Sequence, residues 1–104
     1  MQETVFACNM NAISPEQRPA HQQLAEQLFT SKQAVHEMSN GYRFEFSAEW
    51  LVMLAQFVSL ERLCCPFFDF AIQVDANSDT LSLQLTGTEG VKAFIRAEFG
   101  ELLN

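Results

Sequence analysis

Basic side chains are scarce in this sequence. Its 6 lysines and arginines stand against 13 aspartates and glutamates, for a formal net charge of −7 at pH 7, and no stretch gathers the basic residues together. Nucleic acids are bound largely through lysine and arginine contacts to phosphate, so an acidic surface repels them. We therefore expect no nucleic-acid partner.

Long apolar segments are also missing. The longest apolar run, near position 50, is broken by Gln56, Ser59, Glu61 and Arg62. It is well short of the roughly 20 residues that cross a bilayer. The N-terminal stretch MQETVFACNM lacks a basic start followed by an apolar segment, so no secretory signal is visible. The 3 cysteines are odd in number, which does not indicate a disulfide framework and fits a reducing compartment. We expect a cytoplasmic protein without a membrane partner.

Apolar side chains are plentiful. The 104 residues are 48% hydrophobic and include 10 phenylalanines but only one tryptophan and one tyrosine. This length and composition predict one globular domain over residues 1–104. So many phenylalanines exceed what a small core easily hides, which predicts an apolar, Phe-rich surface for a homodimer.

The first half of the chain predicts a strand, a helix and a hairpin. Residues 4–10 favour a strand. A helix is expected from a capping box at Ser14 to about Ser31, with a slightly later start because Pro19 weakens the first turn. In residues 34–47, Asn40-Gly41 suits a type I′ turn. That register sets His36 opposite Glu45 and directs three aromatic side chains to the core: Tyr42, Phe44 and Phe46.

The second half predicts a helix, a second hairpin and a last helix. The first of these helices, capped by Ser47, ends at Leu63 or Cys64 because Pro66 follows. Strands are expected at 67–74 and 80–86, the second with Leu81, Leu83 and Leu85 inward and Thr80, Ser82, Gln84 and Thr86 outward. A helix capped by Thr88 covers 89–103. The order β-α-β-β-α-β-β-α predicts an α+β domain with a mainly antiparallel sheet covered by helices.

A carboxylate interrupts the apolar face of the helix before Pro66. At about 100° per residue, Glu61 falls near the centre of the arc of Leu54 and Phe57, beside Cys64. A buried carboxylate is costly unless it is paired, protonated or coordinating an ion. Arg18 and His21 of the first helix are the candidate partners. The alternatives are a structural hydrogen bond, or a helix rotated so that Glu61 meets water.

The adjacent Cys64 and Cys65 are the other chemical feature. Their Cα atoms, about 3.8 Å apart, are too close for an ordinary disulfide. The helix C-terminus disfavours a thiolate nucleophile. Cysteine also packs as a small hydrophobe, the reading we favour for Cys8 taken alone. A metal site survives these objections: Glu61, Cys64 and Cys65 form a soft, anionic set that Cys8 or His21 completes, suited to Zn(II), Cu(I), Hg(II) or As(III).

The segment LERLCCPFFDFAIQVD, followed by LSLQLTGTEGVKAFI, resembles a group of small, largely uncharacterised bacterial proteins with an E-R-x-C-C-P-F core. The stretch carrying Cys8, Arg18 and His21 is also similar. Some of these proteins lie near or are fused to heavy-metal regulators of the MerR type, but the group has no established activity. The matching positions are Glu61, Arg62, Cys64, Cys65, Pro66, Phe67, Gly87, Glu89, Gly90 and Val91, while Thr88 replaces the expected proline.

Three functions follow in order of preference. The first is soft-metal or metalloid binding through Cys64 and Cys65 with Glu61. The alternative is a non-catalytic dimerisation or interaction module whose cysteines are core packing. An enzyme using Glu61, Arg18 and His21 in acid-base work ranks last, because the thiols lack an activating setting.

Overall fold

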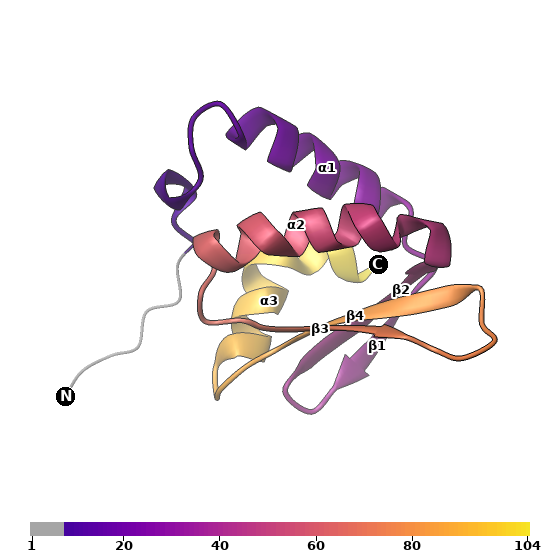
Figure 1. Ribbon diagram of the computed structural model, residues 1–104. Helices are drawn as coiled ribbons and strands as arrows, with labels where there is room; N and C mark the ends of the chain where they lie inside the picture. The colour runs from indigo at the N-terminus through magenta and orange to yellow at the C-terminus, as the bar shows by residue number, and fades with distance from the viewer. Residues whose placement is uncertain (1–7) are drawn as a thin grey trace.

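A four-stranded antiparallel sheet organises the chain. The computed structural model describes residues 8–104 (Figure 1). The strand order is β1-β2-β4-β3. The bounds are β1 Ala34–Met38, β2 Gly41–Ser47, β3 Asp69–Val74 and β4 Thr80–Thr86. The two hairpins thus meet through β2 and β4, which pair along their full length.

Three helices lie against one face of this sheet (Figure 1). They are α1 Arg18–Thr30, α2 Leu51–Cys64 and α3 Val91–Phe99, with short 3-10 turns η1 Met10–Ala12, η2 Ala48–Trp50 and η3 Gly100–Leu103. α1 and α2 run side by side in the layer above the strands. The predicted single α+β domain with a helix-covered antiparallel sheet is therefore confirmed.

The element order differs from the prediction at the start. Of the predicted strand at 4–10, residues 4–7 lie outside the described residues, and Cys8 to Met10 form no strand. The Asn9 backbone N–H donates to the Cys64 carbonyl at 2.8 Å, and the Asn9 side chain accepts from the Asn11 backbone N–H at 3.0 Å. The segment therefore docks on the end of α2 and turns into η1, because its backbone partner is a helix terminus and not the sheet.

The first hairpin keeps its predicted faces but not its register. Met38 pairs with Gly41, and His36 lies opposite Arg43. Neither Asn40 nor Gly41 has a positive φ, so the predicted type I′ turn is wrong. The register is displaced by two residues, which preserves the alternation of faces. Phe44 and Phe46 are fully buried as predicted, and His36 Nε2 reaches Glu45 diagonally at 2.6 Å.

The starts of α1 and α2 were predicted less well than their ends, whereas α3 ends at Phe99, four residues before the predicted end. α1 begins at Arg18, with Pro19 in its first turn. Ser14 Oγ donates to the Gln17 side chain at 3.0 Å, so it does not cap a backbone N–H. α2 follows the η2 turn and ends at Cys64 as expected. α3 starts at Val91 after Gly90, whose φ of 96° is left-handed.

The described phenylalanines lie in the core or pack against it. Every phenylalanine in residues 8–104 is buried or half-buried. One aromatic cluster joins Phe29 to Phe44, Phe46 and Phe57, and a second surrounds Phe68. No described phenylalanine is exposed, so a Phe-rich surface for a homodimer has no support here and the homodimer stays a prediction. Ser82, expected outside, is buried on the central strand β4. Within residues 8–104 no helix has the length and apolar character to cross a bilayer.

Gly41 offers a test of the β2–β4 pairing. A Cβ at Gly41 would overlap the Leu85 carbonyl oxygen and lie 2.8 Å from Thr86 Cα. We expect Gly41→Ala to lower the free energy of unfolding by about 1–3 kcal/mol, the usual effect of overpacking. Gly100→Ala is the matched control, because nothing lies within 4 Å of its added Cβ. Urea unfolding of both variants measures the difference, and equal stabilities would contradict the close approach of the strands.

Candidate functional site

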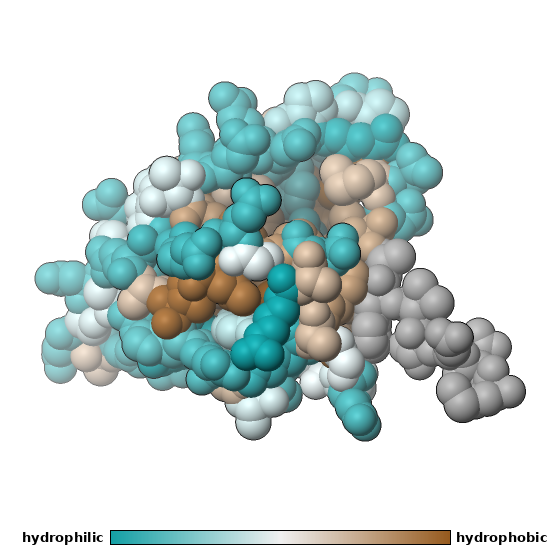
Figure 2. Space-filling model, turned by 180° about the vertical axis from the view of Figure 1, so that it is seen from behind, coloured by the Kyte–Doolittle hydropathy of each residue, from teal (hydrophilic) through white to brown (hydrophobic). Residues whose placement is uncertain are grey.

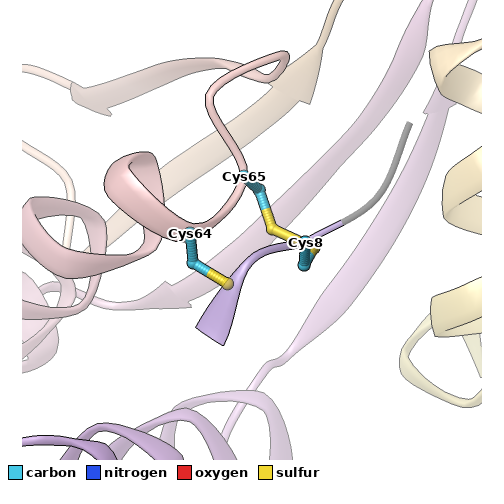
Figure 3. Close-up of side chains that lie close together, drawn as sticks. All are labelled: Cys8, Cys64 and Cys65. Carbon is cyan, nitrogen blue, oxygen red and sulfur yellow. A yellow bond between two sulfur atoms is a disulfide. The ribbon is translucent and has the colours of Figure 1, made fainter. Parts of the chain in front are cut away.

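The end of α2 is covalently joined to the N-terminal segment. Cys8 and Cys65, which are 57 residues apart in sequence, form a disulfide with a Cα–Cα distance of 4.7 Å (Figure 3). This corrects the expectation that the cysteines form no disulfide. An odd cysteine count with two neighbours gives no sign of a partner so distant in sequence. The disulfide also removes the cysteine-based reason to expect a reducing compartment, because disulfides persist mainly in oxidising environments.

The third cysteine completes a compact sulfur cluster. Cys64 is a free, buried thiol. The Sγ atoms of Cys8, Cys64 and Cys65 all lie within 4.8 Å of one another (Figure 3). Cys64 does not bond to Cys65, in keeping with the geometric objection to a disulfide between neighbours. The structure therefore brings together all three sulfurs that the sequence named as candidate ligands.

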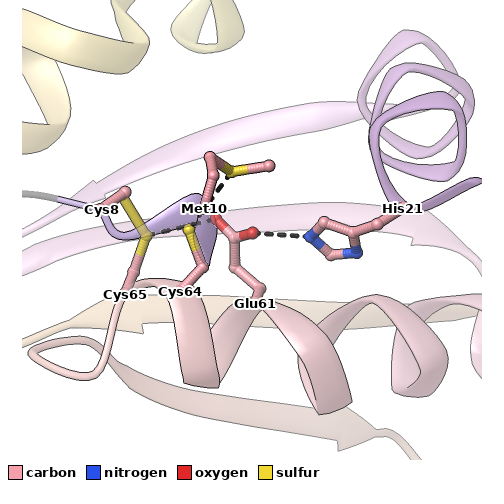
Figure 4. The surroundings of a disulfide bond; sticks show 6 residues. All are labelled: Cys8, Met10, His21, Glu61, Cys64 and Cys65. Atoms are coloured by element: carbon pink, nitrogen blue, oxygen red, sulfur yellow. Dashed lines mark hydrogen bonds and ion pairs between the residues drawn. A yellow bond between two sulfur atoms is a disulfide. The ribbon is translucent and has the colours of Figure 1, made fainter. Parts of the chain in front are cut away.

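Glu61 pairs with His21. The imidazole Nε2 donates to Glu61 Oε1 at 2.9 Å (Figure 4). Their side chains are 4% and 16% exposed, respectively, so the pair is largely shielded from water. The His21 ring also stacks on Phe57, with centroids 5.3 Å apart and planes 10° apart. The predicted position of Glu61 on the apolar face of α2 is confirmed, and one of its two candidate partners is correct.

Arg18 does not reach this pair. Its Nε donates to the carbonyls of Met10 at 3.0 Å and Ile13 at 2.9 Å. Its Nη2 donates to the Asn11 side chain at 3.2 Å. Arg18 therefore fastens the N-terminal turn to α1 and holds the backbone just after Cys8, which is a positioning role.

The second oxygen of Glu61 faces the disulfide. Oε2 lies 3.5 Å from Cys65 Sγ (Figure 4). A disulfide sulfur carries no proton, so this contact becomes a hydrogen bond only when Cys65 is a thiol. The carboxylate thus links the sulfur cluster to His21. In residues 8–104, His21 Nδ1 is a buried side-chain atom without a hydrogen-bond partner.

The Cys64 thiol is held in its protonated form. Burial raises its pKa above the ordinary value for cysteine, the negative charge of Glu61 raises the pKa further, and the Asn9 backbone N–H lowers it in part. The thiol donates to the Met10 sulfur at 3.5 Å (Figure 4). Met10 lies in the predicted strand and was not among the residues selected from the sequence, because a lone methionine gives no ligand signal.

A groove gives access to the cluster. It has a volume of about 780 Å³ and lies between α1 and the C-terminal segment. Figure 2 shows the face behind α2, where hydrophobic surface is framed by hydrophilic side chains. Cys8, Cys64, His21 and Glu61 line the groove, whereas Cys65 does not. The groove therefore reaches the disulfide from the Cys8 side.

No protein-family model, no curated protein and no solved structure matches this chain. The resemblance to proteins associated with heavy-metal regulators therefore stays a prediction.

The disulfide makes a direct prediction about stability. Closing a loop across 57 residues of separation stabilises the folded chain by about 4 kcal/mol in the chain-entropy estimate. We expect a reductant to lower the free energy of unfolding of the wild type by about this amount, measured by urea titration. Cys64→Ala should keep the full response to reductant and Cys8→Ala should lose it. If the reductant leaves the free energy of unfolding of the wild type unchanged, the presence of the disulfide is contradicted.

The raised pKa of Cys64 predicts slow alkylation. At any given pH a raised pKa leaves less thiolate, so the rate of reaction with iodoacetamide should reach half its maximum at higher pH than for a small reference thiol. Glu61→Gln removes a negative charge and should move this midpoint to lower pH. Mass spectrometry of the oxidised protein follows the reaction. A wild-type midpoint at or below that of the reference thiol would disprove the assignment.

Proposed function

We propose that the reduced protein binds a soft metal or metalloid ion through Cys8, Cys64 and Cys65. The observation that carries this proposal is the mutual approach of their three sulfur atoms within 4.8 Å. Three thiolates from two distant segments form a ligand set typical of Zn(II), Cu(I), Hg(II) or As(III). Reduction of the Cys8–Cys65 disulfide must come first, because a disulfide sulfur has no thiolate to offer.

The spacing of the sulfurs suits such an ion. Zn–S bonds of about 2.3 Å in tetrahedral geometry separate two sulfurs by about 3.8 Å. The three sulfurs already lie within 4.8 Å of one another, so small movements bring them to this spacing once the disulfide is open. The backbone bond of 2.8 Å from Asn9 to the Cys64 carbonyl keeps Cys8 beside α2 after reduction. The three thiols thereby stay together without the disulfide.

Glu61 is the fourth ligand in this proposal. Its Oε2 already lies 3.5 Å from Cys65 Sγ, and Oε1 is held by His21 at 2.9 Å. Because His21 Nε2 is occupied by this bond, we assign to His21 the role of orienting the carboxylate. Outer partners of this kind fix the direction of a metal ligand. Arg18, bound to backbone carbonyls, positions the Cys8 segment.

The resemblance of the E-R-x-C-C-P-F segment points to the same class of ligand. On the basis of this resemblance we propose that the protein acts alongside a heavy-metal regulator, as a metal-binding component without catalysis. The protonated, buried Cys64 supports the absence of a thiol nucleophile, since catalytic cysteines have a lowered pKa and an exposed sulfur. A raised pKa does not oppose metal binding, because a bound cation drives deprotonation itself.

Native mass spectrometry of the reduced protein tests the proposal. We expect one ion per chain with Hg(II), Zn(II) or arsenite, and no uptake by the oxidised form. Each of Cys8→Ser, Cys64→Ser and Cys65→Ser should weaken binding about tenfold or more, and His21→Gln about tenfold through loss of orientation.

His36→Gln is the matched control. His36 also pairs with a glutamate, Glu45, but the pair is exposed on the sheet, with side chains 44% and 28% accessible. This variant should bind metal like the wild type. If Cys64→Ser/Cys65→Ser takes up metal unchanged, the proposal is wrong.

A further inference from the structure

We infer that Cys8 is a modification site: a small external thiol enters the groove, attacks Cys8 Sγ and opens the Cys8–Cys65 disulfide through a mixed disulfide on Cys8. The exchange itself is independent of metal binding. Its consequence, control of the metal site by reduction, rests on the proposed function.

Access selects the sulfur that is attacked. Thiol–disulfide exchange depends on which sulfur a thiolate can reach. Cys8 is half-buried and lines the groove. Cys65 is 0% exposed and does not line the groove. A thiolate arriving through the groove therefore meets Cys8, and Cys65 becomes the leaving group on the protected side.

Glu61 receives the leaving group. Once the bond opens, Cys65 Sγ can carry a proton and donate it to Glu61 Oε2, which already lies 3.5 Å away. His21 holds that carboxylate in place through Oε1. The reduced state thus gains a hydrogen bond that the oxidised state lacks, without a rearrangement of α2.

The reaction balances with two molecules of thiol. The first thiolate attacks Cys8 Sγ, the Cys8–Cys65 bond breaks, and the proton released by the attacking thiol ends on Cys65. The second thiolate attacks the external sulfur of the mixed disulfide and frees Cys8, which takes up the second proton. Two external thiols are oxidised to one external disulfide, and the protein disulfide is reduced to two thiols.

Charge in the groove selects the kind of thiol. Among residues 8–104, three carboxylates line it, those of Glu26, Glu61 and Glu101, against one ammonium, that of Lys32. Lys32 Nζ is in turn bound to the Phe29 carbonyl at 3.2 Å. The chain as a whole carries a net charge of −7. A cationic aminothiol is therefore favoured over an anionic thiol of the same size.

Two probe thiols of similar size and opposite charge test the inference. The oxidised, metal-free protein is mixed with cysteamine or with 3-mercaptopropionate, and acid quenching is followed by peptide mass spectrometry. We expect the adduct on Cys8. At equal thiolate concentration cysteamine should react on the order of threefold to tenfold faster. High salt should bring the ratio towards one.

A pair of charge variants localises the effect. Glu101→Gln, at the groove, should reduce the preference for cysteamine, while Glu49→Gln, an exposed carboxylate away from the groove, should not. An adduct on Cys65, no adduct on the native protein, or equal rates for the two thiols would each overturn the inference. None of these outcomes affects metal uptake by chemically reduced protein, so the two proposals fail separately.

Discussion

The attachment of the N-terminal segment to the end of α2 is the constraint on which the site depends. It consists of the Cys8–Cys65 disulfide and the backbone bond from Asn9 to Cys64. Without it, Cys64 and Cys65 are two neighbouring thiols at the end of a helix. With it, a third sulfur lies beside both, and Met10 and Arg18 pack around the joint. This attachment therefore turns a pair of neighbouring cysteines into a cluster of three sulfurs.

The Glu61–His21 pair connects this attachment point to the interior between α1 and α2. A largely shielded carboxylate needs hydrogen bonds on its oxygens, since burial without them is costly. His21 satisfies one oxygen, and the other faces Cys65. The same pair ties α1 to α2 and leaves a groove between α1 and the C-terminal segment. The packing of the two helices and the chemistry of the sulfurs are therefore coupled through one side chain.

The sequence predicted most of the fold because its patterns are local. The alternation of apolar residues predicted both ends of β4, Thr80–Thr86, and Pro66 correctly predicted the end of α2. The first hairpin was assigned to the correct faces in the wrong register. Gly41 is not a turn residue but the first residue of β2, where it pairs with Thr86 and lies too close to the Leu85 carbonyl for a side chain. Ser82 was misplaced because a central strand buries even small polar side chains between its neighbours.

The sequence alone determined that Glu61 lies on the apolar face of a helix beside Cys64, because helical periodicity is a property of the chain itself. It also determined that Cys64 and Cys65 do not bond to each other, because neighbouring Cα atoms are too close. Only the tertiary structure decided which partners these groups find. Cys8, His21 and Met10 reach the site through packing between segments distant in sequence, and no local pattern records such a contact.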